Sequence, residues 1–169
     1  MNDSLIQKEK DAIERLKAFE PKDEPYYLCY SGGKDSDVIR ILAKLADVKH
    51  EVHHNLTSVD APETIWYIQS QPDIIIDKAR YADGTPKTMW NLIPKKKMPP
   101  TRIVRWCCSE LKEGGGKGRL KITGVRWDES RSRRENSNLV NVIGKPNATT
   151  KFFTENNINF LLTNMGGWF

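Results

Sequence analysis

Apolar residues along the chain fall into short continuous runs that alternate with helical stripes. The short runs predict strands at residues 26–30, 51–56, 73–77 and 120–125. The stripes predict helices at residues 4–19, 35–46, 64–71 and 101–112, with one helical turn at residues 89–93. Because strands and helices alternate, the predicted fold is α/β: a three-layer sandwich around a mostly parallel, doubly wound sheet.

Two of the predicted helices have stripes that indicate how they pack. The first carries an apolar stripe that predicts a docking surface: Leu5, Ile6, Ile13, Leu16 and Phe19. The second presents apolar residues at i, i+3, i+4 and i+7: Val38, Ile41, Leu42 and Leu45.

Three histidines, His50, His53 and His54, lie on or beside one predicted strand. Since they do not all face one side of it, no metal site is predicted there.

The length of 169 residues suits a single domain with a core of its own. We divide it into an N-terminal helix and loop (1–25), a core (26–134) and an atypical tail (135–169). Hydrophobic residues make up 38% and charged residues 29%, which is a globular balance. No apolar run reaches the length of a membrane span, and the N-terminus lacks a signal peptide's apolar stretch, so a cytoplasmic location without membrane contact is expected.

The three cysteines are Cys29, Cys107 and Cys108. An odd count with an adjacent pair argues against a disulfide framework and for a reducing compartment. The formal net charge of +5 is concentrated partly in Lys95–Lys97, which we interpret as a solvated basic face. The arginines of the second half of the chain favour a polyanionic partner, either a nucleotide or a nucleic acid.

The junction between the first predicted strand and its helix reads Ser31-Gly32-Gly33-Lys34-Asp35-Ser36. Glycine lets backbone N–H groups approach an oxyanion, and a helix N-terminus adds a favourable dipole. The two serine hydroxyls can donate to phosphate oxygens, and Lys34 supplies positive charge. The string therefore predicts a phosphate-binding loop rather than an ordinary tight turn.

Two common phosphate motifs do not fit this junction. A P-loop requires Ser or Thr after the Gly-Lys pair and a glycine five positions before that pair's glycine, where the chain has Asp35 and Leu28. The dinucleotide fingerprint G-x-G-x-x-G is absent as well. The string instead resembles the PP-loop of the adenine nucleotide α-hydrolase-like superfamily, which includes ATP pyrophosphatases, ATP sulfurylase and phosphoadenosine phosphosulfate (PAPS) reductases. The resemblance implies that Ser31, Gly32, Gly33, Lys34, Asp35 and Ser36 bind an adenine nucleotide.

Three further segments resemble PAPS reductases in family order. In "TSVDAPET" the aspartate before Pro-Glu-Thr is Asp60, which the resemblance makes a nucleotide-binding residue. In "MPPTRIVRWCCSELK" the matching residues are Arg105, Cys107, Cys108 and Lys112. On a helix Arg105, Cys108 and Lys112 would share one face, so the two cations could converge on one anion with a thiol in a positive field. Buried cysteines with basic residues facing water are the alternative.

The last segment, "GVRWDESRSRR", resembles the family's G-x-R–x-x-E-S–x-x-R pattern at Gly124, Arg126, Glu129, Ser130 and Arg133. Arginine forks suit phosphate, and Glu129 could orient one of them or hold Mg²⁺ through water. With Lys34, Arg126 and Arg133 form the predicted catalytic set, and Gly124, Arg126 and Glu129 join the nucleotide-binding set. A basic surface turn is the alternative.

The chain departs from the family in its cysteines and its tail. No cysteine follows Cys108, whereas PAPS reductases act through a C-terminal cysteine. Adenylylsulfate reductases add a later C-x-x-C to the C-C pair, so no four-thiolate iron–sulfur cluster is expected in one chain. The family's usual C-terminal segment is replaced by "NATTKFFTENNINFLLTNMGGWF", which suggests a minimal or truncated member whose apolar tail packs on a protein partner or a second copy.

Three functions stay open at this point. The first is ATP-dependent adenylyl transfer with pyrophosphate release, with Mg²⁺ on the phosphates and a setting in sulfur transfer. The second is PAPS- or adenylylsulfate-reductase-like oxidoreduction, with Cys107 or Cys108 in redox or sulfur handling. The third is a non-catalytic nucleotide-binding subunit of a DNA-modifying complex, which makes DNA an indirect candidate partner.

Overall fold

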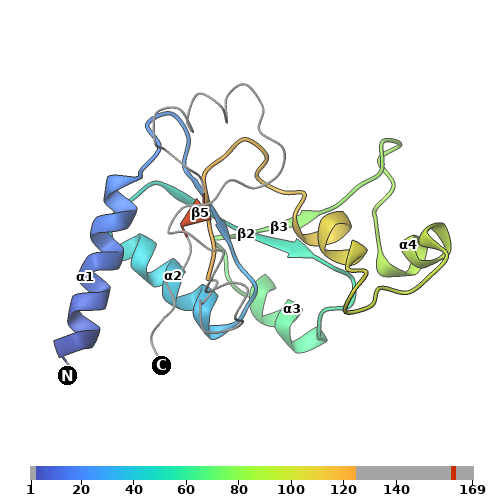
Figure 1. Cartoon of the computed structure of the whole chain (residues 1–169), viewed down its shortest axis with the longest axis horizontal. Helices are drawn as coiled ribbons and strands as arrows, with labels where there is room; N and C mark the ends of the chain where they lie inside the picture. Colours follow the sequence, from blue (N-terminus) through green and yellow to red (C-terminus); the bar gives the residue numbers. More distant parts are fainter. Residues whose placement is uncertain (1–2, 125–160, 163–169) are drawn as a thin grey trace.

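The computed structural model describes residues 3–124 and 161–162 (Figure 1). The helices there are α1 (Asp3–Ala18), α2 (Lys34–Leu45), α3 (Pro62–Gln69), α4 (Met89–Lys96) and a π-helix, η1 (Cys108–Lys112). The strands are β1 (Tyr26–Cys29), β2 (His50–Leu56), β3 (Ile74–Lys78), β4 (Lys121–Ile122) and β5 (Leu161–Leu162). No helix within the described residues is both long and apolar enough to cross a membrane.

The described strands form one sheet in the order β3-β2-β1-β4-β5. Each neighbouring pair is parallel, which confirms the predicted α/β class and parallel sheet. From β1 the chain first moves outward on one side, to β2 and then β3, and only later returns to place β4 on the other side of β1. The strand order thus reverses direction next to β1.

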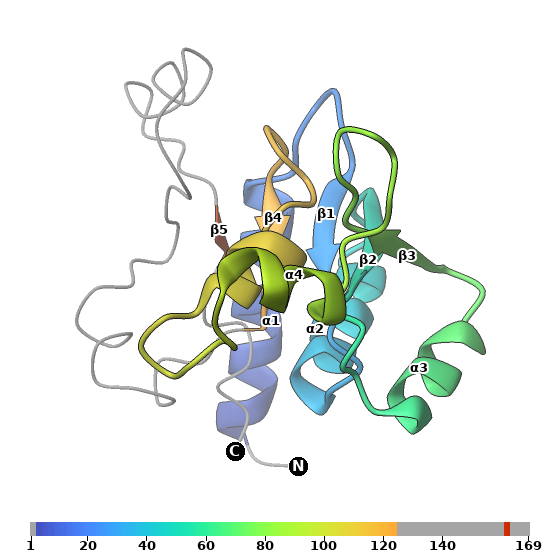
Figure 2. The ribbon, with the colours of Figure 1, turned by 90° about the vertical axis from the view of Figure 1, so that its right-hand side faces the viewer.

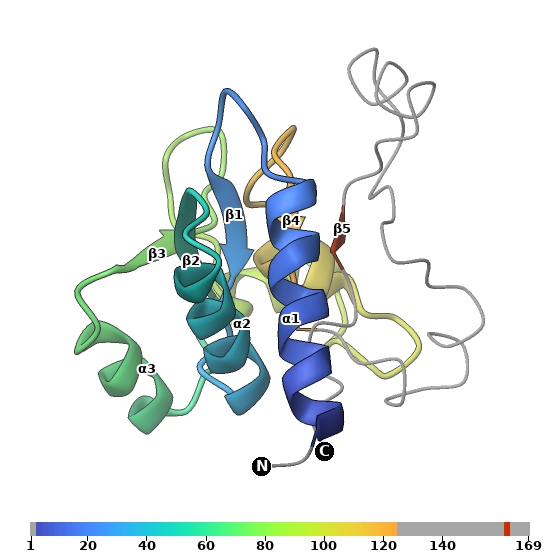
Figure 3. The same cartoon turned by 90° about the vertical axis from the view of Figure 1, so that its left-hand side faces the viewer.

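Helices cover both faces of this sheet. Figure 3 shows α1 and α2 in front of the strands, and Figure 2, from the opposite side, shows α4 and the helical residues 106–112 in front of them. Right-handed crossovers favour this placement, because the connections from β1 to β3 and from β3 to β4 cross the sheet in opposite directions and then pass over opposite faces. The layers therefore agree with a sandwich around the sheet.

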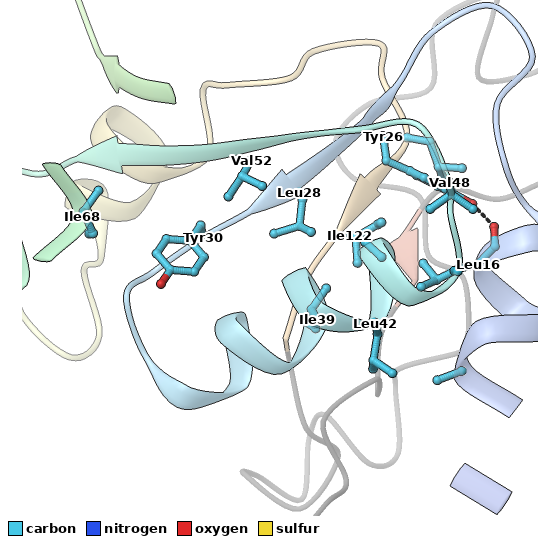
Figure 4. Close-up of a cluster of buried hydrophobic side chains, with 14 residues drawn as sticks. Leu16, Tyr26, Leu28, Tyr30, Ile39, Leu42, Val48, Val52, Ile68 and Ile122 are labelled. Carbon is cyan, nitrogen blue, oxygen red and sulfur yellow. Dashed lines mark hydrogen bonds between the residues drawn. The ribbon is translucent and has the colours of Figure 1, made fainter. Parts of the chain in front are cut away.

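The main core lies between the sheet and the helices α1, α2 and α3 (Figure 4). Leu28 of β1, Ile39 of α2 and Ile122 of β4 are fully buried there. Tyr26 is also fully buried, and its hydroxyl donates to the Leu16 carbonyl at 2.8 Å, so the buried polar group is satisfied. This layer packs β1 against α2 and so positions the junction between the two elements.

Two of the stripe predictions have different outcomes. In α1 Leu16 is buried and Ile13 packs on the core, as does Phe19 just after the helix, which confirms the docking surface at these three of its five residues. In α2 the prediction is partly wrong, because Ile41 and Leu45 are each 56% exposed. The buried face of α2 instead consists of Ser36, Ile39, Leu42 and Ala43. A stripe of large apolar residues does not reveal this face, because two of its four members, Ser36 and Ala43, are small.

A smaller apolar cluster forms apart from the main core. It joins Met89 and Leu92 of α4 to Trp106 and Leu111. The helix α4 is longer than the single turn predicted, and a capping box starts it: the Thr88 hydroxyl accepts from the Asn91 amide, and the Asn91 side chain accepts from the Thr88 amide.

Candidate functional site

The Ser31–Ser36 loop leaves the carboxyl end of β1 and enters α2 directly. Gly32 has φ +78°, a conformation that favours glycine, and a Cβ there would lie 3.0 Å from the Thr64 methyl and 3.2 Å from Ile68 of α3. Gly33 is the N-cap of α2 in an extended conformation, and a Cβ on it would meet only the Ser31 hydroxyl, at 3.6 Å. Gly32 thus shapes the loop, whereas Gly33 leaves open space beside it.

Hydrogen bonds within the loop fix its shape. The buried Ser36 hydroxyl donates to the Gly33 carbonyl at 2.7 Å, and the exposed Ser31 hydroxyl donates to Ser36 Oγ at 3.3 Å. No side chain caps the N-terminus of α2, since Gly33 has none. The Ser36 and Asp37 amides donate to the Gly33 carbonyl, at 3.0 and 3.1 Å, so the position that an N-cap side chain would fill stays available to an external acceptor such as a phosphate.

The segment that follows β4 lies against the same helix N-terminus. A Cβ on Gly124 would be 3.0 Å from Ile39 and 3.3 Å from two atoms of Asp35. Only glycine lets these two segments approach so closely. Since the strand order reverses between β1 and β4, the loops that follow these strands flank the position where open α/β sheets bind ligands.

The other predicted binding residues of this segment are Arg126, Glu129, Ser130 and Arg133. They lie outside the described residues, as do position 125 of the predicted fourth strand and nearly all of the predicted tail. The described part of the sheet therefore shows where the segment starts, at Gly124 beside Asp35, and nothing of its arginines.

Asp60 closes a turn at the carboxyl end of β2. One of its carboxylate oxygens accepts from both the Thr57 amide, at 2.8 Å, and the Thr57 hydroxyl, at 2.7 Å. Within that turn Ser58 has φ +65°. The structure therefore assigns Asp60 a local role that shapes the entrance to α3, whose Thr64 supports Gly32. Among the described residues its carboxylate is hydrogen-bonded to Thr57 and not to the Ser31–Ser36 loop.

The predicted helix at residues 101–112 is wrong in its first half. Residues 101–105 are not helical, and the helix begins at Trp106 and continues as the π-helix η1. Wider π-helical spacing invalidates the i, i+7 relation of Arg105 to Lys112. Arg105 nevertheless contacts Cys108, because its guanidinium donates to Cys108 Sγ at 3.3 Å. Of the predicted face, the structure thus joins Arg105 and Cys108. Lys112 is exposed, and Cys107 packs against the smaller apolar cluster.

A charged cluster covers the η1 face of the sheet, and the sequence did not indicate it. His53 lies between two carboxylates, with Nδ1 2.8 Å from Asp77 and Nε2 3.2 Å from Glu51. Tyr27 stacks on the His53 ring and donates its hydroxyl to Asp77 at 2.7 Å, and Arg119 donates to Glu51 at 2.6 Å. No group of three or more potential metal ligands is present in the described part of the chain. We interpret the cluster as support for the sheet.

Burial and hydrogen bonds set the protonation of this cluster and of the neighbouring Cys29. Burial raises the pKa of Cys29 to about 11 against an opposing effect of Lys121, so this thiol stays protonated at neutral pH. Burial, followed by the hydrogen bond to Asp77, raises the pKa of Tyr27, which keeps its hydroxyl a donor. The hydrogen bond from Arg119 is the main cause that lowers the pKa of Glu51. Cys29 itself is half-buried at the end of β1 and is not among the fully buried core residues.

Glu110 connects η1 to both ends of the α4 region, and its removal should weaken the fold in a pH-dependent way. Its carboxylate pairs with Lys87 at 2.7 Å and with Lys96 at 2.8 Å. The hydrogen bond from Lys87, then that from Lys96, lowers the pKa of Glu110 to about 2 from 4.5. The stabilisation is therefore complete above about pH 4.5 and is lost as the pH falls towards 2.

We expect Glu110→Gln to lower the free energy of unfolding by about 1 kcal/mol at pH 7, since the pair is partly solvated. The difference from wild type should shrink as the pH falls below 4.5, as measured by denaturant unfolding across this range. The exposed Glu14→Gln on α1 is the matched control. A difference that is constant with pH would show that the carboxylate's charge does not matter.

The sequence matches none of the protein-family models compared with it. No curated protein matches it either.

Proposed function

We propose that the chain is an adenine-nucleotide-binding enzyme of the PAPS reductase-like branch of the PP-loop superfamily. In this proposal the sheet is the doubly wound, adenine nucleotide α-hydrolase-like one. The reaction is adenylyl transfer with release of pyrophosphate, in a setting such as sulfur transfer. One observation carries the proposal: the Ser31–Ser36 loop lies where the strand order reverses, with an uncapped helix N-terminus and Gly124 against Asp35.

The loop residues have distinct roles in this proposal. The Gly33 backbone and the positive end of the α2 dipole hold the pyrophosphate part of the nucleotide, since the N-cap Gly33 has no side chain in that position. The exposed Ser31 hydroxyl and the exposed Lys34 ammonium complete the set. Gly32 and the buried Ser36 shape the loop without needing to touch the ligand.

The reaction then requires positioning and charge neutralisation from the protein. An acceptor oxygen attacks the α-phosphorus, the bond from that phosphorus to the bridging oxygen breaks, and the electron pair leaves with pyrophosphate. Lys34 offsets the charge that develops on the leaving group, and Arg126 and Arg133 are proposed to do the same. Mg²⁺ would enter with the nucleotide, held largely by phosphates and water, and would add further neutralisation.

A second candidate, sulfonucleotide reduction, has one observation in its favour. The hydrogen bond from Arg105 to Cys108 places a cation on a thiol of the C-C pair, the arrangement that a sulfur-handling residue needs.

The cysteines Cys29, Cys107 and Cys108 are all free thiols in the structure, which supports our proposal of a reducing, cytoplasmic location.

Pyrophosphate release from Mg-ATP tests the proposed reaction, with and without a cellular extract as the source of acceptor. We expect release by the wild-type chain and a loss of at least about tenfold in Lys34→Ala, because charge neutralisation by one cation contributes on this order. Nucleotide binding without release would favour a non-catalytic subunit instead. Sulfite release from PAPS with a thiol donor, abolished in Cys108→Ser, would favour the reductase.

A further inference from the structure

The connection between β3 and η1 carries an unusual excess of positive charge. From Gly84 to Ser109 the chain contains no acidic residue, whereas it contains six basic ones: Lys87, Lys95, Lys96, Lys97, Arg102 and Arg105. Asp83 and Glu110 flank this segment. We refer to residues 87–105, which include α4, as the basic arm.

Only part of this charge is neutralised inside the protein. Glu110 pairs with Lys87 and Lys96. Lys95 Nζ lies 3.6 Å from the centre of the Tyr81 ring, a contact that keeps its charge. Asp83 interacts electrostatically with Lys95, but among the described residues no carboxylate forms a salt bridge with Lys95, Lys97, Arg102 or Arg105. The arm therefore presents four cations to an external partner.

Apolar side chains stand out among these cations. Trp90 is 72% exposed and Ile103 is 93% exposed, and every residue from 94 to 105 except Pro100 is classed as exposed. On α4 the neighbours Met89 and Leu92 face the smaller apolar cluster, so Trp90 is the single large apolar side chain that this helix turns outward. A membrane-surface helix needs a broad apolar face, which α4 lacks.

The basic arm is anchored at the carboxyl ends of the parallel strands, the end of the sheet at which the Ser31–Ser36 loop also lies. The Met89 amide donates to the Ser58 hydroxyl at 2.8 Å, and Ser58 belongs to the turn that follows β2. Figure 1 shows α4 beyond the arrowheads of β2 and β3. Trp90, next to this anchor, is therefore displayed at the carboxyl end of the parallel strands.

We propose that the basic arm binds single-stranded nucleic acid, with phosphates on Lys95, Lys97 and Arg102 and an unstacked base on the Trp90 ring. An aromatic ring beside a row of cations matches both components of a strand, the charged backbone and the planar base. An acidic protein would satisfy the cations but offers no regular partner for an isolated indole. The inference stands apart from nucleotide binding at the Ser31–Ser36 loop, because it uses none of that loop's residues.

Fluorescence anisotropy with a labelled oligothymidylate of about 20 nucleotides tests this proposal, at about 50 and 200 mM salt. We expect Trp90→Ala to weaken binding roughly 5- to 100-fold at either salt concentration, because one stacked base is lost. We expect replacement of Lys95, Lys97 and Arg102 by Gln to weaken binding and to reduce the slope of log K against log salt by about 2.

The matched control is Trp66→Ala. Trp66 is 67% exposed, almost as much as Trp90, but α3 carries no basic residue. We expect this variant to bind the oligonucleotide as wild type does. Near-equal losses in both tryptophan variants, no binding by wild type, or tighter binding to poly-glutamate than to the oligonucleotide would overturn the proposal. The last outcome would identify an acidic protein as the partner.

Discussion

Gly116→Ala is expected to destabilise the protein by about 2–4 kcal/mol, a loss of roughly 5–15 °C in melting temperature. Gly115 and Gly116 lie against Tyr27, and a Cβ on Gly116 would be 2.6 Å from the ring. Gly116 also has φ +60°, which adds backbone strain for any other residue. The ring cannot move aside, since it is stacked on His53 and bonded to Asp77.

Neighbouring glycines separate the two causes in thermal or denaturant unfolding. A Cβ on Gly115 would lie 2.1 Å from the Tyr27 hydroxyl without a positive φ, so Gly115→Ala measures the steric effect alone. Gly118 has φ +79° with no atom within 4 Å, so Gly118→Ala measures the strain alone, about 1 kcal/mol. Gly114→Ala has neither cause and should be nearly neutral. Equal stability of the Gly114 and Gly116 variants would contradict the packing described.

Gly33→Val is expected to abolish nucleotide binding in a protein that stays folded. The position has φ −96° and ψ 162°, which valine adopts readily, and a Cβ there meets nothing closer than 3.6 Å. The cost to the fold is at most about 1 kcal/mol, from an unfavourable N-cap. The side chain would instead occupy the space that a phosphate needs at the start of α2, so the nucleotide-induced rise in melting temperature should disappear.

Gly32→Val provides the contrast. Its positive φ and the contact with Thr64 make this position structural, so the variant should lose stability even without a nucleotide. If Gly33→Val kept the wild-type nucleotide response, the loop would not be the binding site. If Gly33→Val did not fold, Gly33→Ala would serve as the milder variant in the same nucleotide titration.

Periodicity in the sequence predicted the elements that build the main core. β1, α2 and β2 are found within one residue of their predicted bounds, because continuous apolar runs and helical stripes report burial directly. The strand–glycine–helix junction was predictable for the same reason, since its position follows from the strand before it and the helix after it. The approach of Gly124 to Asp35 was not, because it depends on which strand pairs with β1.

Other features could not be read from the pattern. Ile103 and Val104 mimic a helical stripe, yet both are exposed and the helix starts only at Trp106. The cluster around His53 arises from the register of β1, β2 and β3, which places Tyr27, His53 and Asp77 on one face. Partners across strands lie far apart in the chain, so a single sequence carries no signal for them.

Binding of an adenine nucleotide at the Ser31–Ser36 loop is tested most directly by the melting temperature of the wild-type chain with ATP, adenylylsulfate or PAPS, each with and without Mg²⁺. A ligand that binds only the native state stabilises it by about 2.7 kcal/mol at one hundred times its dissociation constant. We predict a rise of several degrees with at least one of the three nucleotides, absent in Gly33→Val. No rise with any of them at millimolar concentration would contradict the proposed function.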